Sequence, residues 1–215
     1  MINPYYEHAG ITIYHGDCLA IMPELEEKVD LVLADPPYGI NWNTNYTRFT
    51  RERGFNQPYP AVTNDDKPFN PEPFLKFPQV ILWGYNCFAN KLPLGTILIW
   101  DKRYKNGEAF LADGEAAWWN KGHAVYIYSQ TWQGSHKEGE KVRVHPTQKP
   151  ERLMKWCIEK AGKIETILDP FMGSGTTLRA AKDMNRKAIG IEIEEQYCEI
   201  AAKRLQQEVF NFTPD

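Results

Sequence analysis

At 215 residues the chain is long enough for one well-buried α/β domain and short for two. Hydrophobic residues make up 42% of it and charged residues 25%, which is ordinary for a globular protein, and no apolar stretch approaches the ~18 residues that a membrane span needs. Its net charge of −3 gives no general support for nucleic-acid binding, which usually leaves a basic footprint.

The cysteines are scattered along the chain, with no Cys-x-x-Cys pair among Cys18, Cys87, Cys157 and Cys198. This pattern argues against a zinc site and against a disulfide framework, and it favours a reducing cytoplasm. The first eight residues lack the basic start and apolar core of a signal peptide. We therefore expect a cytoplasmic protein that needs no metal.

Alternating strand and helix patterns run along most of the chain. Seven short apolar runs predict strands covered on both faces: Ile11–His15, Leu31–Ala34, Val80–Trp83, Thr96–Trp100, Ala124–Tyr128, Thr166–Leu168 and Ala188–Ile193. Between many of them lie helical patterns: Leu19–Leu25, Pro71–Phe77, Tyr85–Leu92, Arg152–Ala161, Thr177–Met184 and Glu195–Val209. The alternation predicts an α/β protein with a doubly wound, mostly parallel sheet.

Two stretches without periodicity, 41–69 and 129–144, are expected to be inserted loops in one domain that spans 1–215. Long loops in compact domains are usually functional or disordered. Both contain basic side chains: Arg48, Arg51, Arg53, Lys137, Lys141 and Arg143. Their charge alone is compatible with solvated loops and equally with two segments that meet a phosphate backbone.

The tetrapeptide Asp35-Pro36-Pro37-Tyr38 follows the second predicted strand, where open α/β sheets place their ligands. An exocyclic amine has two N–H donors, and the Asp35 carboxylate and the Pro36 carbonyl can accept one each. The Tyr38 ring offers a surface on which a flipped base can stack, a contact worth about 1–3 kcal/mol. A plain turn after a strand is the alternative. Four matched residues favour a pocket for an amino group on a flat base.

A glycine-rich segment, Asp169–Thr177, follows the sixth predicted strand. A phosphate-binding loop needs a lysine after its last glycine, where Thr176 stands, and a dinucleotide fingerprint needs a third small residue, where Leu178 stands. Glu192 ends the next strand, at a spacing where a carboxylate can take two ribose hydroxyls. The segment predicts either a tight structural turn or a loop for a cofactor that has an adenosine group and no phosphates.

Asp35–Tyr38 and Asp169–Thr177 together resemble the catalytic and S-adenosylmethionine motifs of DNA amino-methyltransferases. Their order, catalytic motif first, resembles the permuted β class of N6-adenine and N4-cytosine enzymes. His145–Pro150 matches the segment that precedes the cofactor motif there, and Trp83–Ala89 with Trp100–Lys102 resembles small members from bacteria and phages. The resemblance implies a Rossmann-like class I S-adenosylmethionine-dependent methyltransferase fold, with a mostly parallel seven-stranded sheet that includes an antiparallel strand and a circularly permuted motif order.

The resemblance also implies roles for individual residues. The catalytic pocket would be formed by Asp35, Pro36, Pro37 and Tyr38. The cofactor-binding residues would be Asp17, Cys18, Thr147, Lys149, Asp169, Pro170, Phe171, Gly173, Ser174, Gly175, Thr176 and Glu192. Within this set Asp17 would approach the adenine amine, Glu192 the ribose, and Thr147 and Lys149 the methionine carboxylate. The six basic residues of the two inserted loops would contact DNA, and a homodimer is one expected assembly in a bacterial or phage-infected cell.

The implied reaction is direct attack by the amino nitrogen of a flipped base on the methyl group of S-adenosylmethionine. Methylation at carbon 5 of cytosine needs a cysteine nucleophile, typically after proline, and none of the four cysteines follows one. An aspartate at the first motif position favours N6 of adenine, with N4 of cytosine as the alternative. A non-catalytic subunit that positions DNA, and an RNA or protein amine as substrate, also stay open. The small inserted loops predict a short or degenerate recognition sequence.

Overall fold

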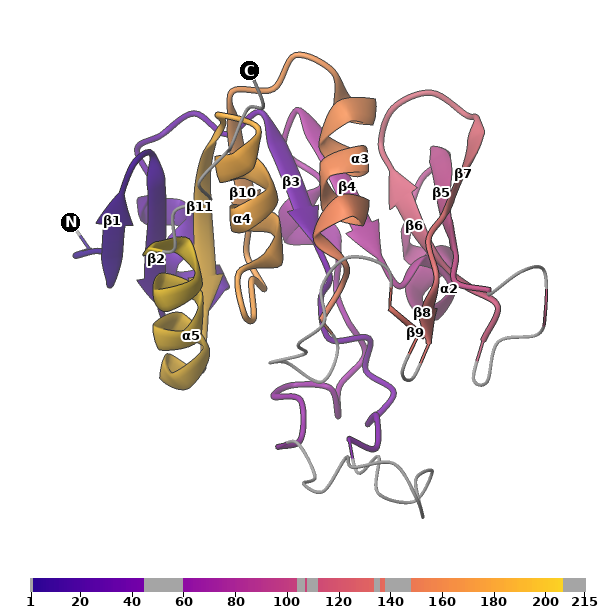
Figure 1. Cartoon of the computed structure of the whole chain (residues 1–215), viewed down its shortest axis with the longest axis horizontal. Coiled ribbons are helices and arrows are strands. Elements are labelled where there is room, and N and C mark those ends of the chain that lie inside the picture. The colour runs from indigo at the N-terminus through magenta and orange to yellow at the C-terminus, as the bar shows by residue number, and fades with distance from the viewer. Residues whose placement is uncertain are drawn as a thin grey trace, which may run out of the picture.

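A mixed sheet forms the centre of the computed structural model, which describes residues 2–44, 60–103, 107, 112–133, 136–137 and 148–206, without the side chains of residues 133, 136 and 137. Within these ranges the sheet has nine strands in the order β1-β2-β11-β10-β3-β4-β6-β5-β7 (Figure 1). Their bounds are β1 Tyr6–His8, β2 Ile11–His15, β3 Leu31–Ala34, β4 Gln79–Trp83, β5 Thr96–Asp101, β6 Gly114–Trp119, β7 Val125–Ser129, β10 Thr166–Asp169 and β11 Lys187–Glu192. A separate pair, β8 Trp132–Gln133 and β9 His136–Lys137, is antiparallel.

All seven predicted strands are present, in the expected mostly parallel α/β sheet. The sheet is wider than the expected seven strands, because β1 and β6 were not predicted. β1 has only three residues and pairs antiparallel with β2 at the edge. β6 reads Gly-Glu-Ala-Ala-Trp-Trp, a composition that lacks β-branched residues and alternation, so no strand pattern is visible in it. It lies antiparallel between β4 and β5 and supplies the expected antiparallel strand.

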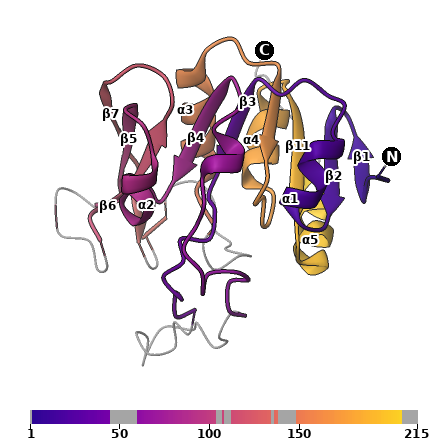
Figure 2. The same cartoon turned by 180° about the vertical axis from the view of Figure 1, so that it is seen from behind.

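Helices cover both faces of the sheet (Figures 1 and 2). One face carries α3 Glu151–Ala161, α4 Thr176–Asp183 and α5 Glu195–Gln206, and the other carries α1 Cys18–Ile21 and α2 Tyr85–Phe88. The patterns before and after the third predicted strand were too long. Pro71–Phe77 forms only a short 3-10 helix, η3 Glu72–Phe74, because Pro71 and Pro73 lack the backbone donors that a longer helix needs. The short helices α1 and α2 each continue as a 3-10 turn, η1 Met22–Glu24 and η4 Ala89–Lys91.

Two groups of buried side chains lie on opposite faces of the sheet. Successive residues of β3 point to opposite faces, so Leu33 packs in the group that contains Leu153 of α3, and Val32 packs in the group that contains Phe88 of α2. All four residues of β3 are buried. A strand covered on both faces needs apolar residues at every position, which explains why the central strands read as continuous apolar runs.

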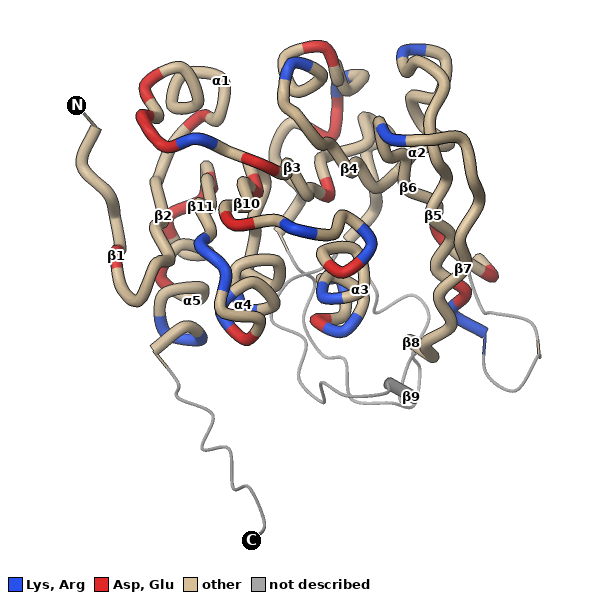
Figure 3. The backbone as a smooth tube through the Cα atoms, turned by 90° about the horizontal axis from the view of Figure 1, so that it is seen from above, with Lys and Arg blue, Asp and Glu red and all other residues tan. Residues whose placement is uncertain are grey.

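Charged residues of both signs are interspersed over the described elements (Figure 3). Among the described residues, no helix combines the length and apolar character needed to cross a membrane. In the same ranges, no group of three or more His, Cys, Asp or Glu side chains is arranged to hold a metal ion.

The order of the strands brings distant parts of the chain together. β10 pairs in parallel with β3, with Ile167 opposite Leu31 and Leu168 opposite Val32, and β11 pairs in parallel with both β10 and β2. The carboxyl ends of these strands therefore meet at one edge of the sheet, where the segments after β3 extend below it in Figure 1. The tetrapeptide and the glycine-rich segment leave neighbouring strands at this edge.

Candidate active site

The tetrapeptide follows β3 directly, since Asp35 is the residue after Ala34. Its first and last side chains contact each other. The Tyr38 hydroxyl donates a hydrogen bond of 2.5 Å to Asp35 Oδ1. Pro36, between them, is buried. Burial raises the pKa of Asp35 above its ordinary value, and the nearby Lys149 ammonium opposes that rise. Burial and the charge of Asp35 raise the pKa of Tyr38 well above its ordinary value, so this hydroxyl stays protonated and acts as a donor.

The Tyr38 ring lies directly against the backbone of Gly84, the residue that follows β4. A Cβ atom at Gly84 would lie 2.1 Å from Cε1 of Tyr38, which no side chain can tolerate. Gly84 also has a φ of +84°, a left-handed conformation that glycine adopts without strain. Both requirements explain the glycine here, and together they fix the ring beside the end of β4.

A cluster of alternating charges surrounds Asp35. Lys149 Nζ lies 2.5 Å from Asp35 Oδ2 and 3.0 Å from Glu115 Oε2, and Lys102 Nζ lies 2.9 Å from Glu115 Oε1. Burial would raise the pKa of Glu115, but the ammonium groups of Lys149 and Lys102 outweigh it and lower that pKa to about 2. The two carboxylates and two ammonium groups thus balance in charge.

The chain after the tetrapeptide is held by Asp65, a buried carboxylate from the segment that returns toward η3. Its Oδ1 accepts from the backbone amides of Gly39 at 2.8 Å and Ile40 at 3.4 Å, and its Oδ2 accepts from Trp42 at 2.6 Å. One side chain therefore satisfies three backbone donors that would otherwise need water, and the Asp65 backbone carbonyl accepts from the Asn41 amide between them. It fixes the exit of the chain from the tetrapeptide.

The glycine-rich segment is built around Glu192, the last residue of β11. Glu192 Oε2 accepts from the Gly173 amide at 2.8 Å, and Oε1 accepts from the Glu194 amide at 2.8 Å. The backbone carbonyl of Glu192 accepts from Gly16. Three loops, after β2, β10 and β11, are therefore tied together at adjacent strand ends. Burial raises the pKa of Glu192 above its ordinary value, and the backbone amides that it accepts from oppose this rise.

Asp169 and Gly175 form the two ends of the same turn. The Asp169 carboxylate accepts from the Phe171 amide at 3.1 Å and is almost fully buried, and this burial raises its pKa to about 7. Gly175 starts α4 with a φ of +79°, and a Cβ there would lie 2.9 Å from the Cβ of Ala201 in α5. A glycine at this position allows α4 to begin close against α5.

Comparison with known proteins agrees with this geometry. The N6/N4 methyltransferase family model, described as DNA methylase, matches residues 99–203. The chain is 28% identical to the type II methyltransferase M.ScaI of Streptomyces caespitosus, over 96% of this chain and 84% of that protein. It is 29% identical to the DNA adenine methyltransferase YhdJ of Escherichia coli (strain K12), over 90% of this chain and 82% of that protein. The crystal structure of an M1.HpyAVI–SAM complex matches with a TM-score of 0.56 and 25% identity, over 90% of this chain and 99% of that one.

The chain is similar to the N6/N4 family of DNA methylases over residues 99–203 and to type II methyltransferases over most of its length. These similarities support a DNA amino-methyltransferase, and the M1.HpyAVI neighbour was solved as a complex with S-adenosylmethionine.

The loops at the ends of β2, β10 and β11 suit S-adenosylmethionine, the ligand of the M1.HpyAVI complex, chemically. The carboxylates of Asp17 and Glu192 are acceptors that match the hydroxyl and amine donors of an adenosine group. Phe171, packed against Phe69 and Phe74, provides an apolar surface beside them. Burial raises the pKa of the Cys18 thiol to about 12, so this side chain contributes as an apolar group rather than as a thiolate.

Of the residues singled out from the sequence, Lys149 differs most in its surroundings from what was expected. It contacts Asp35, Tyr38 and Glu115, and its ammonium also lies 5.9 Å from the centre of the Trp83 ring. Thr147 and the side chains of the six basic candidates lie outside the described residues: Arg48, Arg51, Arg53, Lys137, Lys141 and Arg143.

Four residues at the site were given no role from the sequence: Gly84, Lys102, Glu115 and Asp65. Gly84 and Lys102 fall inside the patterns that resemble small family members, so their positions were visible but their contacts were not. Glu115 lies on β6, whose sequence has no pattern typical of a strand. Asp65 lies in a polar segment beside Asp66, and the sequence does not show which of the two is buried.

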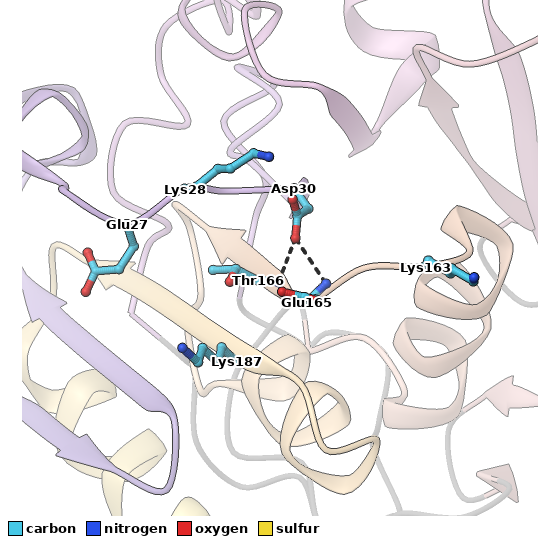
Figure 4. A pocket seen from close by; sticks show the side chains of 7 residues that line it. All are labelled: Glu27, Lys28, Asp30, Lys163, Glu165, Thr166 and Lys187. Carbon is cyan, nitrogen blue, oxygen red and sulfur yellow. Dashed lines mark hydrogen bonds between the residues drawn. The ribbon is translucent and has the colours of Figure 1, made fainter.

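A separate hollow of about 470 Å³ lies at the opposite edge of the sheet, at the amino ends of β3, β10 and β11 (Figure 4). Acidic and basic side chains alternate around it. The Asp30 carboxylate there accepts from the backbone amides of Glu165 and Thr166, both at 3.1 Å. These bonds fasten the start of β10 to the start of β3, so Asp30 has a structural role.

Proposed function

We propose that this protein is a DNA amino-methyltransferase that methylates N6 of adenine in DNA. The observation that carries the proposal is the Asp35 carboxylate, placed after β3 next to the strand that leads into the cofactor loop. An adenine amine has two N–H donors, and Asp35 and the Pro36 carbonyl are the proposed acceptors. The adenine methyltransferase among the relatives supports the choice of base.

The proposed catalytic residues act by alignment and by electrostatics rather than by covalent chemistry. S-adenosylmethionine supplies an electrophilic methyl group when it is bound. Asp35 holds one N–H of the amine, which leaves electron density on the nitrogen directed away from the carboxylate, and Tyr38 offers its ring to the base. The bound cofactor would supply the methyl group and leave as a neutral thioether when its sulfur–methyl bond breaks, and Asp35 is the proposed acceptor for the proton that the amine nitrogen would release. Fixed acceptors of this kind contribute because they need no reorganisation during the reaction.

The other proposed roles concern the rest of the chain. We propose a single methyltransferase domain over 1–215, in which the loops 41–69 and 129–144 contact DNA through their basic residues. Asp17, Cys18, Thr147, Asp169–Phe171, Gly173–Thr176 and Glu192 are the proposed cofactor residues. A homodimer is the proposed assembly, and light scattering in solution would measure its mass.

The substitution Asp35→Ala tests the proposal. We expect S-adenosylmethionine binding to be kept, because the cofactor residues are untouched, and methyl transfer to fall by roughly 10²-fold or more. Transfer would be measured with radiolabelled cofactor and DNA, and binding by calorimetry. An undiminished rate in the variant would show that Asp35 is not the amine acceptor.

Cytosine is the competing base, since the same pair of acceptors fits an N4 amine. DNA from cells that express the protein, digested to deoxynucleosides, would distinguish N6-methyl-2′-deoxyadenosine from N4-methyl-2′-deoxycytidine by mass. Sequencing of the same DNA with detection of modified bases would give the recognition sequence. A protein that binds cofactor and DNA but marks no base would be the non-catalytic subunit.

A further inference from the structure

We propose that Lys149 occupies, in the resting enzyme, the position at Asp35 that the target amine takes during catalysis, and that Glu115 receives the Lys149 ammonium when the base enters. The inference rests on the proposed function of Asp35 as the amine acceptor. Lys149 and Glu115 act through Asp35 and are therefore positioning residues.

The first argument is that the ammonium and the amine use the same kind of contact. Lys149 Nζ donates to Asp35 Oδ2 at 2.5 Å and lies 3.2 Å from the Tyr38 hydroxyl oxygen. It also lies 5.8 Å from the centre of the Tyr38 ring and 5.9 Å from that of the buried Trp83. Its side chain is only 7% exposed. A base that presents its amine to this oxygen has to displace the ammonium.

The second argument is that a new partner is already within reach. Glu115 Oε2 lies 3.0 Å from Lys149 Nζ, but it is buried and makes no aligned hydrogen bond. Its other oxygen, Oε1, is held by Lys102. Glu115 therefore has one fixed oxygen and one with remaining capacity to accept. A lysine ammonium sits on a flexible four-carbon stem, so it can exchange one carboxylate for the other.

The third argument concerns charge. Burial disfavours the ammonium form of Lys149, but Asp35 and Glu115 outweigh it and raise the pKa of Lys149. The group therefore stays positively charged and needs a carboxylate wherever it lies. Transfer to Glu115 keeps it paired and leaves the Asp35 carboxylate more basic, which suits an acceptor for the proton that the amine releases. Without Glu115, the ammonium has Asp35 as its carboxylate partner and blocks the amine.

The test compares Glu115→Gln, Lys149→Met and the double variant, with DNA that carries the recognition sequence found by sequencing. We expect Glu115→Gln to lower kcat by about tenfold or more, because the ammonium stays on Asp35. In the double variant, which has no ammonium to displace, kcat should recover by about fivefold or more over Glu115→Gln. The Kd for S-adenosylmethionine should stay within about twofold in all three, since none of them touches the cofactor loops.

Two control variants separate this mechanism from a general loss of structure. Glu115→Asp keeps a carboxylate and should retain more activity than Glu115→Gln. Glu199→Gln removes an acid of an exposed ion pair on α5, and its kcat should match the wild type. Thermal unfolding of every variant shows whether the fold is kept.

Three results would overturn the inference. One is a double variant no more active than Glu115→Gln. Another is a large loss of cofactor affinity in Lys149→Met, which would assign Lys149 to the methionine carboxylate instead. The third needs no variant: a crystal structure of the wild-type protein with DNA in which the base is at Asp35 and Lys149 has not moved to Glu115. If Asp35→Ala is fully active, the proposed role of Asp35 as amine acceptor fails together with the inference. If Asp35→Ala is inactive and any of the three results is found, only the proposed transfer of Lys149 to Glu115 is rejected.

Discussion

The contact between Gly84 and Tyr38 depends on the absence of a single methyl group. The ring occupies the space in which a side chain at position 84 would begin, and the same position has left-handed backbone. Glycine is thus required for the ring position and not only for the turn. The ring position matters because the Tyr38 hydroxyl is hydrogen-bonded to Asp35.

We expect Gly84→Ala to lower methyl transfer by about 10²-fold, because displacement of a catalytic group by about 1 Å can have that effect. Gly162 provides a matched control. It has the same φ of +84°, but a Cβ there would meet nothing within 4 Å. Gly162→Ala also places a Cβ at positive φ, with ψ at −130° where Gly84 has 22°, so it carries backbone strain of its own without the clash. A larger loss of kcat in Gly84→Ala than in Gly162→Ala would therefore report the clash with the ring. Equal activity of the two variants would contradict the role assigned to the ring position.

Asp169 predicts a pH dependence of stability. Burial raises its pKa to about 7 in the folded protein, whereas an aspartate in an unfolded chain has a pKa of about 3.9. The folded state therefore binds the proton more tightly, and the stabilisation that results is complete below about pH 4 and is lost as the pH rises to about 7. The loss is on the order of 4 kcal/mol at about 1.36 kcal/mol per pKa unit.

The variant Asp169→Asn stays neutral over this whole range, so it should not lose this stability. Urea unfolding without cofactor would give similar free energies for variant and wild type near pH 4, and a more stable variant at pH 8. Parallel curves of unfolding free energy against pH would mean that Asp169 is not responsible.

At the scale of elements, Asp65 controls the segment that leaves the tetrapeptide. Its carboxylate accepts from three backbone amides between residues 39 and 42. Asp65→Asn replaces one of the two acceptor oxygens with an NH₂ group, which cannot accept a hydrogen bond. A buried backbone donor left unpaired lowers the free energy of unfolding by about 1–3 kcal/mol. We expect faster hydrogen exchange at these amides and about tenfold slower methyl transfer.

Asp66→Asn provides the control for this prediction, since Asp66 is the exposed neighbour of Asp65. Exchange measured by mass spectrometry should be unchanged in that variant. If the amides of residues 39–42 exchange equally in both variants, Asp65 does not hold the segment.

The elements that could be predicted are those whose local sequence is sufficient to define them. Of the seven predicted strands, those at the centre of the sheet, such as β3 and β10, are buried on both faces, and α3 carries its apolar stripe into the core, so their patterns follow directly from burial. β7 differs, because it lies at the edge of the sheet and is mostly exposed, although its apolar run predicted a strand covered on both faces. β6 could not be predicted, because its strand state comes from the pairing of Leu82 with Trp118 and of Leu98 with Ala117 across the sheet. Glu115 was missed with it.

The motifs of the candidate site were visible in the sequence, but the contacts of Lys149 were not. Asp35, Tyr38 and the glycine-rich segment directly follow predicted strands. The sequence therefore predicts both the motif and its position at the end of a strand. Lys149 lies just before α3 and Glu115 lies on β6, and the fold brings them into contact. No spacing in the sequence indicates that these two residues are neighbours. The charged network around Asp35 is therefore a property of tertiary structure.

At the scale of the whole molecule, the cofactor should stabilise the fold. S-adenosylmethionine at about 100 times its Kd adds about 2.7 kcal/mol if it binds only the folded state. For a chain of this size that corresponds to a rise in Tm of roughly 5–10 °C. Differential scanning calorimetry would measure it.

Two additions serve as controls for that measurement. Adenosine diphosphate should leave Tm unchanged, because the glycine-rich segment has Thr176 where a phosphate loop has lysine. EDTA should change neither Tm nor kcat, since the described residues hold no arrangement of metal ligands. A loss of activity with EDTA would point to a metal requirement.

The strand order has a consequence for synthesis of the protein on the ribosome. β2 and β3 are close in sequence, yet β10 and β11, from the other end of the chain, lie between them in the sheet. During translation, at about 5–20 residues per second, Tyr38 emerges long before Asp169. β2 and β3 are synthesised before β10 and β11, the strands that separate them in the sheet. The tetrapeptide and the glycine-rich segment therefore come together only after β10 and β11 have been inserted. A chain that terminates before Asp169 thus has the tetrapeptide but lacks the glycine-rich segment. We therefore expect such a chain not to methylate DNA.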